Sequence, residues 1–283
     1  MRLNPFNTDN IQVKGSRGGG VGKAGGVGCG TIIIAALGYF VFGLDPFQTA
    51  ATVESVQQGT QVGSGGDMTE EEACNANEYS REACNGLQSL NQTWSRVFQE
   101  QGLGDRFQQP TLHLYSGGVR TACGTGQSSM GPFYCPGDQT IYIDTEFYDQ
   151  LARMAGGGGD FARYYVLAHE YGHHIQTITG ISGQIRSAQQ SVGRAQANQL
   201  QVRMELQADC YAGVWAGKNR NLIEAGDIEE GMRAASAIGD DRLTGGRVSS
   251  ENFTHGTSAQ RSEALRTGLR GNDAACDAYT TVR

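Results

Sequence analysis

Residues 168–174 read AHEYGHH, and this stretch decides the fold because it contains the pattern His-Glu-x-x-His. Residues four positions apart lie on the same face of a helix, so His169 and His173 can direct both imidazoles at one zinc ion. Glu170 would lie beside that ion, where it can take a proton from a metal-bound water. The pattern is typical of zinc hydrolases, although a surface helix could carry the same letters by chance.

The neighbouring residues indicate that the pattern lies in the middle of a mostly apolar helix. Asp160 follows four glycines and suits the N-cap position, while Gly180 suits the left-handed position that closes a helix. Between them, apolar residues recur at steps of three and four: Phe161, Tyr164, Leu167, Ala168, Tyr171, Ile175 and Ile178. Two histidines buried there without a ligand would be costly, which favours a buried metal site. Gly172 weakens this helix and indicates a close approach of another segment or of the metal.

Charge is distributed unevenly along the 283 residues. The formal net charge is −7, which gives no global support for nucleic-acid binding. Residues 1–28 carry four basic residues against Asp9, a net charge of +3, so the remainder carries −10. Because this first segment is also rich in glycine, we predict that it is a flexible tail.

An uncharged stretch follows the basic tail. From Ala24 to Leu44 no charged residue occurs over 21 positions, which is long enough for one membrane span. The purely apolar part, residues 31–44, is shorter, so the hydrophobic region of a signal peptide is the competing interpretation. We favour a transmembrane anchor at residues 29–44, because no clean cleavage site follows directly. Basic residues before the span place residues 1–28 in the cytoplasm.

These features predict four segments in the chain. They are a flexible glycine-rich basic cytoplasmic tail, 1–28; a transmembrane anchor, 29–44; a flexible linker, 45–67; and a folded domain, 68–283. The protein would then be a single-pass protein of the inner (cytoplasmic) membrane, with the folded domain facing the periplasm or the outside. Thr69 and Glu72 form a potential capping box, which marks the start of the folded domain.

The seven cysteines fit an oxidising compartment. Cys29 lies at the predicted membrane face. The other six form an even number: Cys74, Cys84, Cys123, Cys135, Cys210 and Cys276. Six cysteines allow fifteen pairings. Proximity in the sequence favours Cys74–Cys84 and Cys123–Cys135, which leaves Cys210–Cys276.

Periodicity elsewhere predicts an α+β domain that is mostly helical, with a small β-sheet. A disulfide between Cys74 and Cys84 requires the first helical region to break near residues 75–77, because one continuous helix would hold these cysteines about 15 Å apart. Short strands are expected at these positions: Thr111–Tyr115, Gly131–Cys135 and Thr140–Ile143. Further helices are expected at these positions: about 187–218, from Asp227 onward, and from Thr257 or Ser258 to about Arg270.

A catalytic zinc needs a third protein ligand besides His169 and His173. Glu205 and Asp209 are four residues apart on one predicted helix face, where two like charges repel each other. If one carboxylate binds a cation and the other accepts a hydrogen bond from a histidine N–H, the pair becomes stabilising instead of repulsive. We predict that Glu205 binds zinc and that Asp209 accepts a hydrogen bond from a ligating histidine. A solvated acidic pair is the alternative.

Two other histidines fit the predicted zinc site less well. His174 points about 100° away from His173 around the helix axis, which indicates a structural histidine. His113 alternates with leucines in a predicted strand, on the face opposite those leucines, so we expect it at the surface. Neither residue is included in the predicted site.

Several segments carry a resemblance to a known family. Residues 169–173 together with Glu205 and Asp209 look like the Glu-ligand zincins, the gluzincin group of metallopeptidases. The longer segments are more specific: GTGQSSMGPFYC at 124–135, HEYGHH at 169–174, RMELQADC at 203–210, IGDDR at 238–242 and FTHGTS at 253–258. They resemble the bacterial family of putative neutral zinc metallopeptidases over roughly residues 85–283. The resemblance implies a zincin-like α+β metallopeptidase domain, zinc as the cofactor and a single membrane anchor.

The resemblance also implies a role for His255. In Glu-ligand zincins a His, Tyr or Arg from a later segment often stabilises the oxyanion, and His255 lies just before the predicted final helix. We therefore expect His255 to be catalytic together with Glu170. A loop histidine without a role is the alternative.

The predicted function is that of a membrane-anchored zinc metallopeptidase, an endopeptidase acting on protein or peptide substrates outside the cytoplasmic membrane. Zinc (Zn2+) would be held by His169, His173 and Glu205, and Glu170 would act as the base. The membrane is the other expected partner, and nucleic acid is not expected. The alternative is a membrane-anchored zinc-binding adaptor without peptidase activity, against which Glu170 argues, since a structural site needs no base. A hydrolase of non-peptide amides, such as cell-wall cross-links, is a third interpretation.

Overall fold

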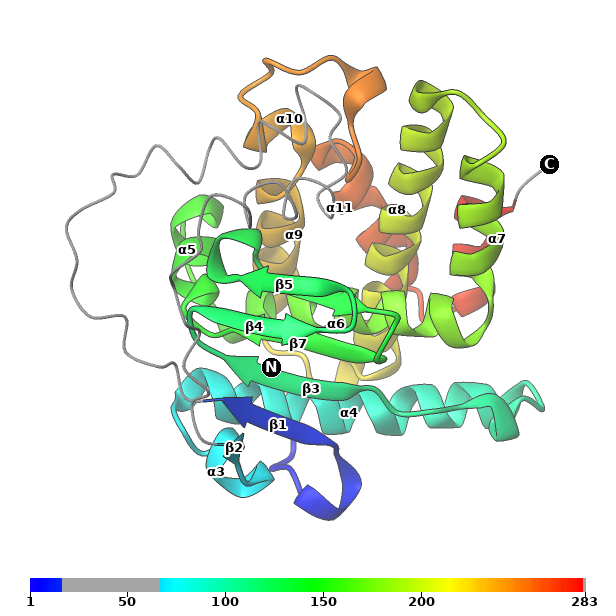
Figure 1. Cartoon of the computed structure of the whole chain (residues 1–283). Coiled ribbons are helices and arrows are strands. Elements are labelled where there is room, and N and C mark those ends of the chain that lie inside the picture. The colour runs from blue at the N-terminus through cyan, green and yellow to red at the C-terminus, as the bar shows by residue number, and fades with distance from the viewer. Residues whose placement is uncertain (17–66, 282–283) are drawn as a thin grey trace.

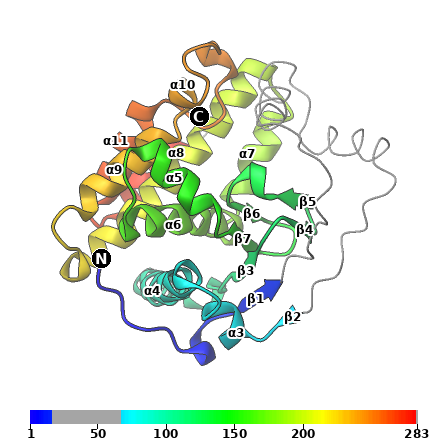
Figure 2. The same ribbon diagram turned by 90° about the vertical axis from the view of Figure 1, so that its left-hand side faces the viewer.

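A five-stranded mixed sheet forms one side of the molecule, and most of the helices lie on the other side (Figures 1 and 2). The structure is a computed structural model that describes residues 1–16 and 67–281. The strand order is β2-β1-β3-β7-β6, in which β1, β3 and β7 run parallel and the two edge strands are antiparallel to their neighbours. The strands of this sheet are β1 (Val13–Ser16), β2 (Asp67–Met68), β3 (Thr111–Tyr115), β6 (Phe133–Cys135) and β7 (Thr140–Asp144).

Each face of the sheet contributes to a different core. Leu112 of β3 and Ile141 of β7 point to the helical side and join the main hydrophobic core, as the alternation along a strand requires. The opposite face packs against a two-stranded antiparallel hairpin, β4 (Gly118–Thr121) and β5 (Gly124–Gln127). Val119 of this hairpin belongs to a second, smaller core. The predicted α+β class with a small sheet agrees with this arrangement.

The helical elements range from single turns to a helix of 25 residues. The α-helices are α3 (Glu70–Cys74), α4 (Glu78–Glu100), α5 (Phe147–Ala155), α6 (Asp160–Ile178), α7 (Ile181–Gln189), α8 (Arg194–Lys218), α9 (Asp227–Ala237), α10 (Asp240–Leu243), α11 (Ser258–Gly268) and α12 (Asp277–Thr280). Short 3-10 helices complete the connections: η1 (Thr8–Asn10), η2 (Gly104–Arg106), η3 (Ser128–Met130), η4 (Arg220–Leu222), η5 (Ser250–Asn252) and η6 (Asp273–Cys276).

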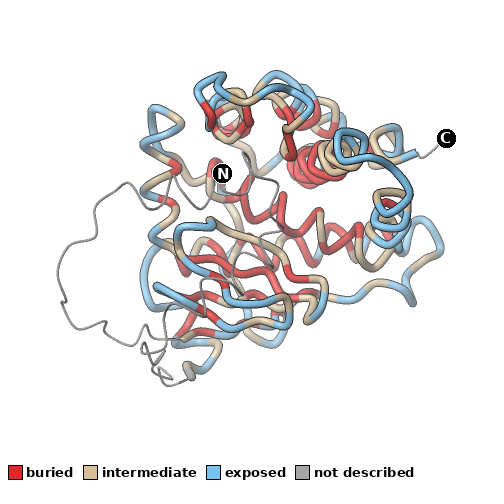
Figure 3. Tube along the Cα trace, turned by 45° about the horizontal axis from the view of Figure 1, so that its top comes forward, coloured by how far each residue is buried: buried red, intermediate tan, exposed pale blue. Residues whose placement is uncertain are grey.

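Helix α6 lies inside the helical layer. It packs against α4, α8 and α9, and it is buried along most of its length, as the red segments through the middle of Figure 3 illustrate. Near its start, the rings of Phe161 and Tyr164 contact the fully buried Trp215 of α8. Because α6 is covered by other helices, the polar side chains in its middle need partners inside the protein.

The structure differs from the predicted flexible tail over residues 1–16. Val13 is buried in β1, which pairs with both β2 and β3, and the Met1 ammonium lies 3.0 Å from a carboxylate oxygen of Asp160. Gly15 explains the discrepancy: a Cβ at this position would come within 2.7 Å of the Ala73 Cβ. Glycine here permits close packing of β1 and is not a sign of flexibility.

The fold class and location predicted from the sequence included one transmembrane helix, and this prediction is corrected. Across residues 1–16 and 67–281, no helix is both long enough and apolar enough to cross a membrane. The three longest helices, α4, α6 and α8, each carry several charged residues, which is the physical reason. The predicted span at residues 29–44 lies outside the described residues. The single-pass location in the cytoplasmic membrane is corrected with it.

Most predicted helix boundaries are confirmed to within a residue, but Gly159 and not Asp160 is the N-cap of α6, and the prediction of a single helix at 187–218 is wrong. The first helical region breaks at residues 75–77, and Thr69 and Thr257 each form a capping box. Gly180 has φ of +83° after the end of α6, as a closing glycine requires. The single helix expected at 187–218 is two helices, α7 and α8. The chain leaves α7 after Gln189, and extended Gly193 precedes α8.

The three disulfides confirm the pairing that sequence proximity favoured. They join Cys74 to Cys84, Cys123 to Cys135 and Cys210 to Cys276. The first two close loops of 10 and 12 residues, whereas the third spans 66 residues and ties α8 to the C-terminal η6.

We expect the Cys210–Cys276 disulfide to contribute more to stability than the Cys74–Cys84 disulfide. A cross-link that closes a longer loop removes more conformational entropy from the unfolded chain, about 4 kcal/mol against about 3 kcal/mol for these two loops. Urea unfolding of Cys210→Ala/Cys276→Ala and of Cys74→Ala/Cys84→Ala, under non-reducing conditions, measures the difference. An equal or larger loss in the second variant would contradict this expectation.

Candidate metal centre

The close packing of α6 against α8 brings the four predicted zinc-site residues together. A Cβ on Gly172 of α6 would lie only 2.9 Å from the Ala208 Cα of α8, so glycine is required where the two helices meet. Of the two expected reasons for a glycine inside the motif, another segment or the metal, the close approach of α8 is the one observed. Ala208 lies beside Asp209 and three residues after Glu205, so both acidic side chains come next to α6.

Three side chains of α6 and α8 direct donor atoms at one point. Nε2 of His169 lies 3.1 Å from Oε2 of Glu205, and Nε2 of His173 lies 3.6 Å from Oε1 of Glu205. Ligand atoms around a tetrahedral zinc ion with bonds of 2.0–2.1 Å are separated by about 3.3 Å. The observed separations are close to that value, and two imidazoles with one carboxylate form a donor set that suits zinc. The three residues present therefore fit a zinc ion.

Hydrogen bonds on the far side of each ring set the tautomers of both histidines. Nδ1 of His169 donates to Oδ1 of Asp209 at 2.8 Å. Nδ1 of His173 donates to Oε1 of Gln176 at 2.9 Å, because the Gln176 amide nitrogen itself donates to the Met204 carbonyl. With the Nδ1 protons held in this way, the Nε2 lone pairs of both rings are available at the common point.

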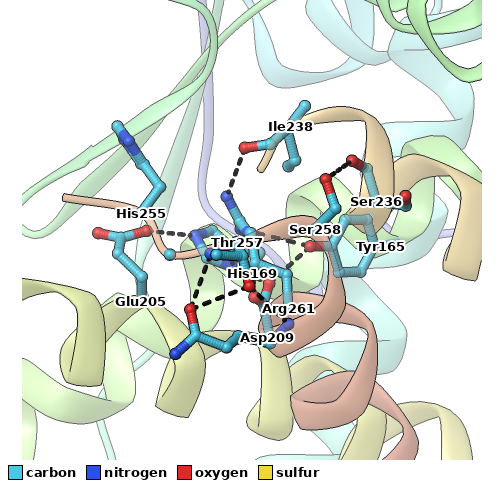
Figure 4. A network of polar contacts seen from close by, with 12 residues as sticks. Tyr165, His169, Glu205, Asp209, Ser236, Ile238, His255, Thr257, Ser258 and Arg261 are labelled. Atoms are coloured by element: carbon cyan, nitrogen blue, oxygen red, sulfur yellow. Dashed lines mark hydrogen bonds and ion pairs between the residues drawn. The ribbon is translucent and has the colours of Figure 1, made fainter. Parts of the chain in front are cut away.

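Asp209 is the centre of a fully buried polar network (Figure 4). Besides the His169 ring, it accepts a hydrogen bond from the Tyr165 hydroxyl at 2.6 Å. The guanidinium of Arg261, on α11, donates to both of its oxygens at 2.9 Å. The prediction had Asp209 beside a ligating histidine, and the structure has that contact; Arg261 is an additional partner that balances the buried negative charge.

The charged groups at the centre shift the pKa values of one another. Burial lowers the pKa of His169, but Asp209 and Glu205 raise it more, to about 10. Burial also opposes ionisation of Glu205, yet His173 and His169 keep the pKa of its carboxyl well below the usual range. A metal ion needs neutral imidazoles, so a divalent cation that binds here would displace a proton from the histidines.

Glu170 and the three side chains that could bind zinc line one large cleft. The cleft has a volume of about 820 Å³, within the range of about 300–1,000 Å³ that is typical of ligand sites. Glu170 and Glu205 both line it, and each is less than 10 % exposed. Among the described residues the Glu170 carboxylate has no hydrogen-bond partner, so it is available to accept a proton from a molecule in the cleft.

His255 lines the same cleft and is held by a buried carboxylate. Asp240, the first residue of α10, accepts a hydrogen bond from Nδ1 of His255 at 3.1 Å. Its second oxygen accepts from the backbone N–H groups of Thr254, His255 and Gly256 at 2.7–3.1 Å. Asp240 therefore holds both the loop and the His255 ring in place beside the cleft.

The two histidines that were excluded from the predicted site lie elsewhere. His113, expected at the surface, is half-buried on the hairpin side of β3, where it contacts the Ser16 hydroxyl at 3.2 Å and its ring lies tilted 5.3 Å from the Tyr142 ring. His174 is fully buried, and its Nε2 donates to the Gln108 carbonyl at 2.7 Å while its Nδ1 accepts from the Tyr134 hydroxyl. His174 therefore fastens α6 to the segments before β3 and in β6.

Four side chains that support the centre were not predicted from the sequence: Tyr165, Gln176, Asp240 and Arg261. Gln176 had a usable signal, because the third residue after His173 lies on the same helix face. Asp240 and Arg261 come from α10 and α11, and no spacing rule relates them to a motif roughly 70 or more residues earlier. Only the folded structure brings them to His255 and Asp209.

Comparison with known proteins agrees with this geometry. The family described as "Putative neutral zinc metallopeptidase" matches residues 6–279. The uncharacterized protein YpfJ of Escherichia coli (strain K12) is 44% identical over 254 residues, which cover 88% of this chain and 84% of that protein. The uncharacterized protein Rv2575 of Mycobacterium tuberculosis is 42% identical over 193 residues, covering 62% of this chain and 64% of that protein. No solved structure matches the chain.

We expect Arg261→Met to be strongly destabilising. The substitution leaves Asp209, which is 0% exposed, without its compensating charge, and breaking a buried ion pair in this way costs about 3–5 kcal/mol. Arg266→Met is the matched control on the same helix, because Arg266 is 59% exposed and its removal should cost under about 0.5 kcal/mol. Urea unfolding of both variants measures the difference. A loss at Arg261 no larger than that at Arg266 would contradict the role of this buried pair.

Because His174 is buried, we expect the unfolding free energy of the protein to depend on pH. Burial lowers its pKa to about 4, against about 6.5 in the unfolded chain. Between these values the unfolded chain binds a proton that the folded protein does not, so stability is lost as the pH falls from about 6.5 to about 4, by about 3 kcal/mol in total. His174→Gln should remove this contribution. The check is the unfolding free energy of both proteins across this range with a chelator present; parallel pH profiles would refute it.

Proposed function

The chain belongs to the family of putative neutral zinc metallopeptidases, and on that basis we propose that it hydrolyses peptide bonds in the cleft beside α6. Zinc is the cofactor of the family. In this proposal His169, His173 and Glu205 hold the zinc ion, and Asp209 orients His169. Bound zinc supplies a Lewis acid that polarises the scissile carbonyl and acidifies water. The protein residues supply binding, orientation and proton transfer.

Glu170 is the general base in the proposed reaction. It accepts a proton from the attacking water and delivers this proton to the nitrogen of the leaving amine, so one carboxylate serves both halves of the reaction. Its low exposure and its place in the cleft beside His169 support this role. His255, oriented by Asp240, stabilises the negative charge that develops on the carbonyl oxygen.

One observation carries the proposal. His169 and His173 each donate their Nδ1 proton to a partner, and their Nε2 atoms converge with the buried Glu205 carboxylate. Beside these three groups lies the Glu170 carboxylate, which has no hydrogen-bond partner among the described residues. A structural zinc site would use four protein ligands, whereas three converge here and the fourth side opens into the cleft. The cleft extends along both sides of these residues, from α5 to α7, which supports cleavage within a chain and so an endopeptidase.

The test is the variant Glu170→Gln, which should retain one zinc per chain and lose peptidase activity by about 10²–10⁴-fold, because a general base is removed while the ligands are kept. Metal analysis and the cleavage rate of an unfolded protein provide the two measurements. Glu263→Gln is the matched control, since Glu263 is 60% exposed on α11 and should change neither quantity.

The possible outcomes separate the proposed function from its alternative. Purified protein that contains no stoichiometric zinc would refute the ligand assignment. Zinc-loaded protein that cleaves no peptide would support a zinc-binding adaptor instead. Equal activity of Glu170→Gln and the unchanged protein would refute the role of Glu170 alone.

A further inference from the structure

Besides its catalytic residues and several neutral polar side chains, the cleft is lined by bulky apolar residues and by arginines. The proposed reaction does not use these apolar residues, nor the arginines Arg186 and Arg247. The cleft spans Met154 of α5 and Arg186 of α7, and these two helices lie on opposite sides of the molecule in Figure 1. It is therefore long enough to contact residues on both sides of a scissile bond.

Exposed apolar side chains converge on this cleft. Within residues 1–16 and 67–281 the exposed large hydrophobic residues are Met130 at 54%, Met154 at 38%, Val192 at 38% and Leu243 at 49%. All except Val192 line the cleft, although they come from η3, α5 and α10. Apolar groups gathered from separate elements onto one hollow indicate an apolar ligand, and methionines adapt to ligands of varied shape.

The uncommitted charge of the cleft is positive. Among its lining residues, Glu170, Glu205 and the histidines belong to the catalytic centre, and Arg261 is neutralised by Asp209. The remaining charged residues are Arg186 and Arg247, both exposed, and neither forms an ion pair with any residue in the described part of the chain. The whole protein carries −7, so this positive lining opposes the overall charge and would attract an anionic group locally.

We propose that the cleft selects extended peptides that combine a bulky apolar side chain with a nearby carboxylate. The apolar side chain packs among Met130, Met154 and Leu243, and the carboxylate pairs with Arg186 or Arg247. This inference rests on the proposed peptidase function and specifies its substrate class. The carboxylate belongs either to an acidic side chain or to the C-terminus of the peptide, because an arginine binds both in the same way.

Cleavage of a small peptide set by the zinc-loaded full chain tests the proposal. The peptides carry Leu or Ser at the apolar position and Glu or Lys at the flanking position, each with a free or an amidated C-terminus. We expect kcat/KM to be about tenfold higher for Leu than for Ser. We expect a further roughly two- to fivefold preference for Glu over Lys, which decreases as salt is added. Loss of cleavage on amidation would identify the C-terminal carboxylate as the group bound.

Substitutions of residues that line the cleft test which side chains cause the preference for Leu and the preference for Glu. Arg186→Gln and Arg247→Gln should reduce the Glu-over-Lys ratio, singly or together, whereas Met154→Ser should reduce the Leu-over-Ser ratio. Arg266→Gln, an exposed change outside the cleft, is the control and should leave both ratios unchanged. Zinc content is measured for each variant, so a lost metal site is distinguished from a changed preference.

Peptide binding to the Glu170→Gln variant tests the proposed selectivity independently of peptidase activity. Fluorescence anisotropy of the labelled peptides should give the same order, with the Leu–Glu peptide bound most tightly. If the zinc-loaded protein cleaves nothing, the proposed function fails, while this order of binding still supports the selectivity. Equal binding of the Leu–Glu and Ser–Lys peptides, or a preference for Lys, would overturn the selectivity even if the protein proves to be an active peptidase.

Discussion

The contact between Gly172 and Ala208 is the constraint on which the rest of the centre depends. It lets the backbones of α6 and α8 meet without an intervening side chain. Only at this separation can Glu205 reach the Nε2 atoms of both histidines while Asp209, one turn further along α8, reaches the other side of His169. A side chain at residue 172 would separate the helices and move all four groups at once.

Buried charge explains why so much of the surrounding protein is committed to these few residues. An isolated ionised carboxylate such as Asp209 is not tolerated inside a protein, so α11 contributes Arg261 and α6 contributes Tyr165. The same logic applies at Asp240, where three backbone N–H groups and a histidine satisfy one buried carboxylate. The last third of the chain thereby contributes partners to the candidate metal centre, although the His-Glu-x-x-His motif lies near the middle of the sequence.

The parts of the structure that follow local rules could be predicted from the sequence. The helix around His169, the capping box at Thr69 and the two short-range disulfides all depend on residues close in the sequence, at most 12 positions apart for the disulfides. The position of β1 could not be predicted, because Val13 pairs with Leu112 across the sheet and the sequence between them gives no sign of it. The partners of Asp209 and His255 were missed for the same reason: Arg261 and Asp240 meet them only after α8, α10 and α11 have packed.

The place of β1 inside the sheet also sets an order of events during synthesis. Lys14 pairs with His113, so β1 lies beside a strand that the ribosome produces about a hundred residues later. At roughly 5–20 residues per second, β1 has no β3 to join for about 5–20 s. Such distant pairing slows folding, because a long loop must close before its contacts form. The nascent chain therefore assembles this sheet only after its central strands have left the ribosome, with the edges unpaired until then.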